Sequence, residues 1–152
     1  MADDLLVITA SSGENLRLAG RFTALAQGAG LQASILDLTT VPLPLFTPAR
    51  LAEEGIPAAI ADLSARLAAV PRWLICTPEY NGSIPPVLSN AIAWLSVADP
   101  DFRRLFNGRP IAMATHSGGG GTTVLMALRL QLAHLGAHVV GRQVGANRSR
   151  PA

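Results

Sequence analysis

The sequence WLICTPEYNGSIPPVLSNAIAWL, residues 73–95, contains a complete strand–loop–helix unit. The apolar run Trp73–Cys76 is followed by a loop rich in proline, glycine and polar residues. After Pro85 and Pro86, apolar residues recur at the three- and four-residue spacing of one helical face. A continuous apolar run is typical of a parallel strand covered on both faces, and proline is well tolerated in the first turn of a helix. The stretch therefore predicts a buried strand and a helix that packs against it.

Apolar runs alternate with helix-period segments along the whole chain. Five runs are expected as strands: Leu5–Thr9, Gln32–Leu38, Trp73–Cys76, Ile111–Thr115 and Ala137–Val144. This alternation is typical of a parallel sheet joined by crossover helices, and such crossovers are right-handed in nearly all proteins. The sequence therefore predicts an α/β fold with a doubly wound, five-stranded parallel sheet. We expect one domain over residues 1–144, followed by a short basic tail over residues 145–152.

Short local signals predict where the helices begin and end. Ser11 and Glu14 have the spacing of a capping box, which would open the first helix. In that helix, Leu18, Phe22 and Leu25 share one stripe that we expect to face the sheet. The other expected helix boundaries are Thr47-Pro48, Gly55, Pro57, Pro85-Pro86, Thr122 or Thr123, and Gly136.

The composition fits a single globular domain. The chain has 152 residues, of which 49% are hydrophobic and 14% charged, so a sizeable core is available. No apolar run is long enough to cross a membrane, and the start at Met1–Asp4 is acidic, whereas a secretory signal would be basic. The lone Cys76 ends an apolar run, so we expect a buried, inert thiol. Together these features predict a cytoplasmic protein without a membrane partner.

The charged residues are unevenly distributed. All 12 basic residues are arginine, and seven of them lie in residues 102–152, which hold none of the ten acidic residues. Such asymmetry attracts anions such as the phosphates of a dinucleotide or an oxyanion substrate, and it is equally compatible with a solvated face or a subunit contact. The arginines are scattered and accompany no nucleic-acid-binding motif, so no nucleic-acid partner is expected.

Three loops follow expected strand ends, which is where parallel sheets bind their ligands: Ala10–Asn15, Thr77–Ile84 and His116–Gly121. The first is small and polar at a helix start, so its N–H groups and hydroxyls suit a phosphate, although an ordinary capped turn explains it as well. It is neither a Walker A loop nor a GxGxxG motif. The third loop carries four consecutive glycines, which form either a nest of N–H groups around a ligand or a flexible turn.

The second loop is the most informative of the three. It places the Tyr80 ring, the Asn81 amide and Gly82 just past a central strand and between prolines. A rigid backbone with exposed N–H groups can border a flat heterocycle, whose face Tyr80 can cover in part. Glu79 has no histidine or second carboxylate near it in the sequence to act with as a general base, so we interpret it as a polar loop contact.

The run Pro78–Pro85, followed by Leu88, Asn90-Ala91-Ile92 and Trp94, resembles the signature segment of the NADPH-dependent FMN reductases, a family that includes chromate, quinone and azo-dye reductases. Residues 128–140 are similar to the fourth helix and fifth strand of that family. The resemblance covers most of residues 5–144 and implies a flavodoxin-like fold with strand order 2-1-3-4-5. The chain departs from the family pattern in a shorter phosphate loop without an arginine, and the final helix of the fold is expected to be missing.

The resemblance also implies which residues contact the cofactor. Those expected to hold the FMN phosphate are Ser11, Ser12 and Asn15. Those expected to border the isoalloxazine ring are Pro78, Glu79, Tyr80, Asn81 and Gly82. Those expected to approach its pyrimidine side are Ser117, Gly118 and Gly119. No metal ligand and no catalytic side chain is expected, because the flavin carries the chemistry.

The implied activity is transfer of electrons from NADPH or NADH through FMN to a small acceptor, such as a quinone, an azo compound, chromate or flavin, in ping-pong order. Two alternatives stay open: a flavin-binding electron carrier, and a degenerate, non-catalytic member that serves as an assembly or regulatory subunit. A sheet face left open by the missing helix also predicts a homodimer or homotetramer.

Overall fold

The computed structural model describes residues 2–152; Met1, the first residue of the expected domain, lies outside the described part. Its strands are β1 (Leu5–Thr9), β2 (Ala33–Asp37), β3 (Trp73–Cys76), β4 (Pro110–His116), β5 (His138–Val139) and β6 (Val144–Ala146). All pair in parallel in the order β2-β1-β3-β4-β5, and β6 also pairs with β4. The predicted α/β class and the strand order 2-1-3-4-5 are confirmed.

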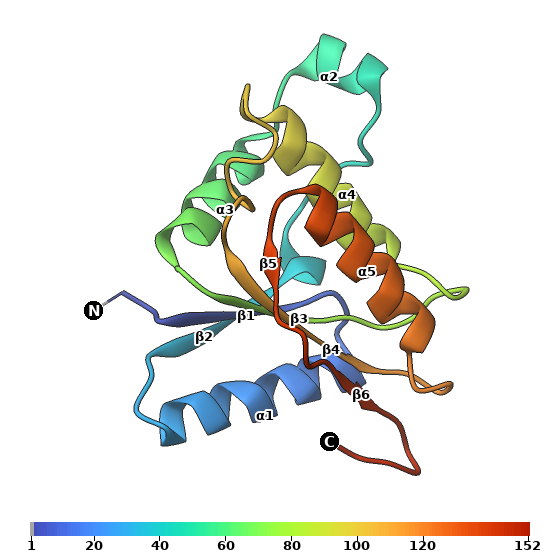
Figure 1. The fold of residues 1–152 in the computed structure, drawn as a ribbon. Helices are drawn as coiled ribbons and strands as arrows, with labels where there is room; N and C mark the ends of the chain where they lie inside the picture. Colours follow the sequence, from blue (N-terminus) through green and yellow to red (C-terminus); the bar gives the residue numbers. More distant parts are fainter. Residues whose placement is uncertain (1) are drawn as a thin grey trace.

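The helices lie on both faces of the sheet (Figure 1). They are α1 (Glu14–Gly28), α2 (Pro48–Glu54), α3 (Ala58–Ala69), α4 (Pro86–Val97) and α5 (Thr122–His134). Helices α3, α4 and α5 cover one face, where the larger core forms around residues such as Ile75, Trp94 and Leu128. Helix α1 covers the other face, over a smaller core that includes Leu18 and Cys76. No helix within residues 2–152 has the length and apolar character needed to cross a membrane.

Most helix boundaries predicted from the sequence are confirmed. Helix α2 begins after Thr47, whose hydroxyl accepts a hydrogen bond from the Arg50 N–H at 3.0 Å, and ends at Gly55. Helix α4 begins at Pro86. Helix α5 is followed by Gly136 at φ +86°, a left-handed conformation that favours glycine.

Two predictions about α1 are wrong. Ser11 and Glu14 form no capping box, because the helix begins one residue past Gly13 and has no side-chain cap. Glu14 instead forms an ion pair with Arg17, three residues along the helix. The expected inward stripe is also displaced: Leu18 is buried, but Leu25 is 69% exposed, because the buried face of α1 continues through Thr23 and Ala26 instead.

The run Ala137–Val144 was expected as one strand, and this is a further correction. It divides into β5, which pairs with Pro110 and Ile111, and β6, which pairs with the last three residues of β4. Gly141 and the exposed Arg142 interrupt the apolar pattern between them. β6 extends to Ala146, two residues past the expected end of the domain, and the rest of the tail follows it. It forms a turn closed by the Asn147 N–H donating to the Arg150 carbonyl at 3.0 Å, with no helix in its described residues.

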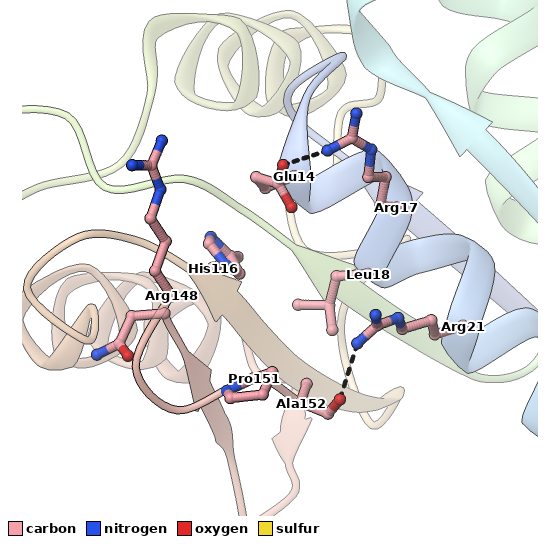
Figure 2. Close-up of a pocket in the computed structure, with 9 residues that line it drawn as sticks. Glu14, Arg17, Leu18, Arg21, His116, Arg148, Pro151 and Ala152 are labelled. Carbon is pink, nitrogen blue, oxygen red and sulfur yellow. Dashed lines mark hydrogen bonds and ion pairs between the residues drawn. The ribbon is translucent and has the colours of Figure 1, made fainter.

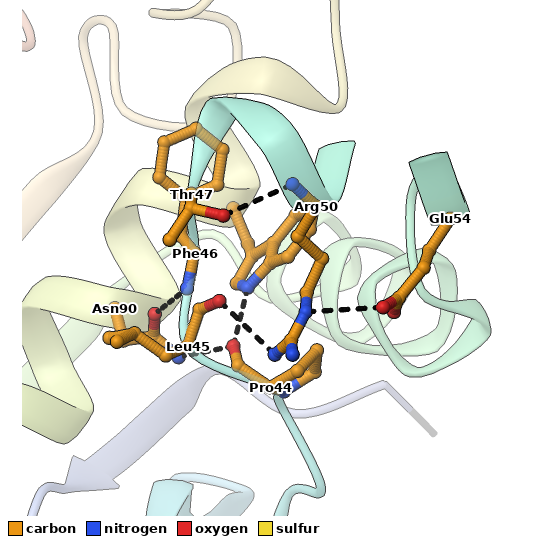
Figure 3. A network of polar contacts seen from close by, with 8 residues as sticks. Pro44, Leu45, Phe46, Thr47, Arg50, Glu54 and Asn90 are labelled. Carbon is orange, nitrogen blue, oxygen red and sulfur yellow. Dashed lines mark hydrogen bonds and ion pairs between the residues drawn. The ribbon is translucent and has the colours of Figure 1, made fainter. Parts of the chain in front are cut away.

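The segment of residues 41–57, which contains α2, projects from the body of the molecule and is fastened at its base (Figure 1, Figure 3). The Pro44 carbonyl accepts hydrogen bonds from Asn90 Nδ2 at 3.0 Å and from Trp94 Nε1 at 2.8 Å. Asn90 Oδ1 accepts from the Phe46 N–H at 2.8 Å, and the Phe46 and Trp94 rings meet edge to face at 5.1 Å. Trp94 is fully buried, so its role is packing and support of this segment.

Candidate functional site

The three loops singled out from the sequence meet at the carboxyl ends of β1, β3 and β4. These strands are neighbours in the sheet, so the loops after them leave from one edge. Backbone hydrogen bonds continue the pairing past the strands: the Ala10 N–H donates to the Cys76 carbonyl at 3.1 Å, and the Thr77 N–H donates to the Ala114 carbonyl at 3.0 Å. The expectation that the three loops lie together is confirmed.

The first loop turns sharply between β1 and α1. Thr9 Oγ1 donates to the Ser11 carbonyl at 2.9 Å, and Ser11 Oγ accepts from the Gly13 N–H at 3.4 Å. The Ser12 side chain is exposed. Helix geometry leaves the N–H groups of Glu14 and Asn15 without a partner within the helix, whereas the Leu16 N–H donates to the Gly13 carbonyl at 3.0 Å. This loop therefore offers backbone donors and two hydroxyls to an anion.

Asn15 lies beside these donors but is occupied elsewhere. Its side chain is only 2% exposed. Its Nδ2 donates to the His116 carbonyl at 3.0 Å, and its Oδ1 accepts from the His116 N–H at 2.8 Å. Asn15 therefore joins the first loop to the third, and both ends of its amide are used within the protein.

The second loop contains a tight two-residue turn. Tyr80 and Ser83 exchange two backbone hydrogen bonds, at 3.1 and 3.0 Å, around Asn81 and Gly82. Asn81 has φ +53° and Gly82 has φ +71°, both in the left-handed region that Asn-Gly turns occupy. The turn leaves the Tyr80 side chain 51% exposed, whereas Pro78 is buried. An aromatic ring is thus presented at the sheet edge on a rigid support.

Glu79 connects the second loop to the third. Its Oε2 accepts a hydrogen bond from the Val124 N–H, in the first turn of α5, at 3.0 Å. The residue before α5 is Gly121, which has no side chain to cap the helix. A carboxylate is favourable here because the N-terminus of a helix carries partial positive charge. Glu79 is therefore the polar loop contact that we expected, and its partner is helix α5.

The third loop is closely packed beneath its glycines. Gly120 and Gly121 have φ +83° and +69°, and a Cβ on Gly121 would collide with the Thr115 side chain. A Cβ on Gly145 in β6 would lie 2.7 Å from the Gly120 carbonyl oxygen. Among the described residues, the buried hydroxyl oxygens of Thr115 and Ser117 have no hydrogen-bond partner. The backbone at Gly120 and Gly121 is therefore held in place by close packing against neighbouring residues. Gly118 and Gly119, in contrast, are exposed.

Sequence reasoning missed a pocket beside the loops, between α1 and the tail (Figure 2). Its volume is about 280 Å³, and its lining includes Arg17, Arg21, His116 and Arg148. The unequal distribution of arginine was the available signal, but no pattern indicated that the tail folds back on α1.

Cys76 lies at the end of β3 directly below the second loop. It is fully buried, and desolvation raises the pKa of its thiol from 9.0 to about 12. A thiol that stays protonated is neither a nucleophile nor a metal ligand at neutral pH. The prediction of a buried, inert thiol is confirmed.

The fold is that of the flavodoxin-like proteins. A flavodoxin from the domain Archaea superposes with a TM-score of 0.66 at 10% identity, covering 95% of this chain and 82% of that one, which shows the fold alone. FerB, a flavoenzyme NAD(P)H:(acceptor) oxidoreductase from Paracoccus denitrificans, superposes with a TM-score of 0.75 at 26% identity, covering 91% of this chain and 75% of its own.

The model of the family described as NADPH-dependent FMN reductase matches residues 4–150, and the chain belongs to that family. A quinone reductase from Escherichia coli K12 is 37% identical over 102 residues, which are 66% of this chain and 53% of that protein. An NAD(P)H-dependent FMN reductase from Pseudomonas aeruginosa is 31% identical over 150 residues, which are 93% of this chain and 77% of its own. The chain thus spans about half the length of the quinone reductase.

Proposed function

We propose that the protein binds FMN at the edge formed by the three loops and transfers electrons from NADPH or NADH to a small acceptor. The observation that carries the proposal is that three features meet at one sheet edge. They are the polar loop before α1, the exposed Tyr80 ring and the glycine loop before α5. Family membership supports the same cofactor and donor.

The residues at this edge fit FMN. Ser11, Ser12 and the first turn of α1 would hold the phosphate, because hydroxyls and free N–H groups at a helix N-terminus suit an anion. Tyr80 and the Asn81-Gly82 turn would border the ring. Ser117 would offer it the hydroxyl that lacks a partner within residues 2–152. Asn15 and Glu79, which we expected to contact FMN, would instead hold the loops around it.

Bound FMN would accept hydride from the nicotinamide and would pass electrons to the acceptor. The chain contributes binding and orientation. Gly118 and Gly119 would let the backbone come close to the pyrimidine edge of the ring, where their N–H groups would stabilise negative charge. The absence of an arginine in the phosphate loop leaves neutral donors there, and the Glu14 carboxylate lies in the first turn of the same helix, so we expect FMN to bind weakly.

Titration with FMN and anaerobic reduction test this proposal. FMN should bind saturably, and addition of NADPH or NADH without oxygen should bleach the flavin absorbance, which a quinone should then restore. Tyr80→Ala should weaken FMN or acceptor binding while the protein stays folded, whereas Phe102→Ala, another partly exposed aromatic far along the chain, should not. Flavin that binds but stays oxidised with both nucleotides would support an electron carrier, and no binding would support a non-catalytic subunit; either result overturns the reductase proposal.

We also propose that the protein is a homodimer or homotetramer. Helix α1 alone covers its face of the sheet, and Leu25 on this helix is 69% exposed. Burying such apolar surface against a second copy is favourable. Size exclusion with light scattering should report a mass above the monomer, and Leu25→Glu should lower that mass more than Leu45→Glu, which changes an equally exposed leucine elsewhere. A monomer at micromolar concentration would overturn this proposal.

A further inference from the structure

The pocket between α1 and the tail has a positively charged lining. Arg17 and Arg21 come from α1, Arg148 comes from the tail, and all three line the same pocket as His116 (Figure 2). We propose that this pocket is a second anion site, which binds one phosphate-type dianion separately from the flavin.

The charges of the pocket do not cancel one another. Its one carboxylate, Glu14, is paired with Arg17, and Arg21 Nη1 donates to the Ala152 carbonyl at 2.8 Å. Arg148 forms no ion pair with any residue in the described part of the chain. With Arg17 held by Glu14 and Arg21 held by Ala152, Arg148 is the arginine of the lining whose charge an anion entering the pocket would neutralise.

The chemistry and size of the pocket select the class of ligand. The planar guanidinium group donates two parallel hydrogen bonds to the oxygens of a phosphate, and the lining includes three arginines from two elements, of which Arg148 forms no ion pair in the described part of the chain. Its volume of about 280 Å³ lies just below the usual range for small-molecule sites, so one phosphate with a small substituent fits. A free oxyanion and the phosphate of a nucleotide share this chemistry.

The pocket is separate from the edge where FMN is proposed to bind. Successive side chains of a strand point to opposite faces, so His116 points toward α1 and the pocket, while Thr115 points beneath the glycine loop. Ser11, Tyr80 and Gly118 do not line the pocket. The Asn15 side chain, bonded to the His116 backbone, lies at the boundary between the two regions.

Inorganic phosphate titrated into the full chain without added flavin tests the proposal by calorimetry and by NMR of the histidine rings. The chain has three histidines, and phosphate should shift the ring signals of His116 but not those of His134 and His138. Arg148→Ala should weaken phosphate binding about fivefold, because it removes charge-assisted hydrogen bonds at a partly screened site. Arg142→Ala, which removes an exposed arginine outside the pocket, should change it less than twofold.

Adenosine 2′,5′-bisphosphate in a parallel titration distinguishes the two sources of the anion. Tighter binding than inorganic phosphate would assign the pocket to a nucleotide phosphate, and equal or weaker binding would assign it to a small oxyanion; both support the site. The proposal is overturned if neither compound binds saturably in the millimolar range, if His116 does not shift, or if Arg142→Ala weakens binding as much as Arg148→Ala. These measurements need no flavin, so their outcome is independent of whether the proposed reductase activity is found.

Discussion

The Asn15 side chain holds the backbone of His116 at both of its polar groups, with Nδ2 donating to the carbonyl at 3.0 Å and Oδ1 accepting from the N–H at 2.8 Å. The two residues are 101 positions apart in the sequence and belong to α1 and β4. A buried side chain thus sets the spacing between the first and third loops, and the shape of the site depends on it.

We expect Asn15→Ala to lower the free energy of unfolding by about 2–3 kcal/mol, because it leaves two backbone groups of His116 without partners in a largely buried place. Urea denaturation followed by circular dichroism measures this change. Ser12→Ala, which removes an exposed hydroxyl from the same loop, should change stability by less than about 0.5 kcal/mol. Equal stability of the two variants would show that the Asn15 contacts contribute nothing.

Glu79→Ala should destabilise the protein by about 1 kcal/mol, because α5 then loses the acceptor for the Val124 N–H. Glu79→Gln keeps an oxygen acceptor and should lose less. Because Glu79 also holds the second loop against the third, the alanine variant should weaken FMN binding more than the glutamine variant. Thermal unfolding and FMN titration measure the two effects, with the exposed Glu53→Ala as control. The same FMN affinity in both Glu79 variants would contradict the proposed positioning role.

Gly118 and Gly121, at the two ends of the glycine run in the third loop, should respond differently to replacement by alanine. Gly121→Ala places a Cβ against Thr115 at a positive φ, and we expect a loss of about 1–3 kcal/mol of stability. Gly118→Ala meets no atom within 4 Å and lies outside the left-handed region, so its stability should be nearly unchanged. Chemical denaturation of both variants checks this. A loss of similar size at Gly118 would mean that the loop is packed differently.

The buried thiol of Cys76 should make the free energy of unfolding depend on pH above 9. Burial raises the pKa of its thiol from 9.0 to about 12, so the unfolded chain releases this proton at lower pH than the folded one. The contribution of the protonated thiol to the free energy of unfolding is therefore fully present below pH 9.0. It is lost as the pH rises from there towards about 12. Cys76→Ala should reduce the fall in stability over this range, and iodoacetamide should alkylate the thiol only after unfolding. Rapid alkylation of the folded protein at pH 8 would contradict its burial.

The sequence was sufficient to predict the first four strands of the sheet, because long apolar runs and helix-period stripes are repeated signals that tertiary contacts rarely override. It also predicted that the loops after β1, β3 and β4 meet, since this follows from parallel pairing. The Asn81-Gly82 pair carried a further signal for a tight turn that was not used.

The contacts of individual polar side chains could not be predicted. The partner of Asn15 lies 101 residues away and that of Glu79 lies 45 residues away, and no local pattern specifies such pairs. The capping box at Ser11 and Glu14 failed for a local reason: the spacing was present, but Gly13 occupies the N-cap position and Glu14 pairs with Arg17. The residues of a site are easier to predict than the atoms with which they interact.

The division of the last strand into β5 and β6 has a consequence for aggregation. The outermost strand of a sheet presents unpaired N–H and C=O groups, onto which a strand of another molecule can add. Here β5 has two residues and β6 has three, and Arg129 Nη2 donates to the carbonyls of Val140 and Gly141 between them, at 2.9 and 3.4 Å. A foreign strand would find no continuous row of partners along this edge. The interruption therefore removes the template on which strand addition at this end of the sheet would depend.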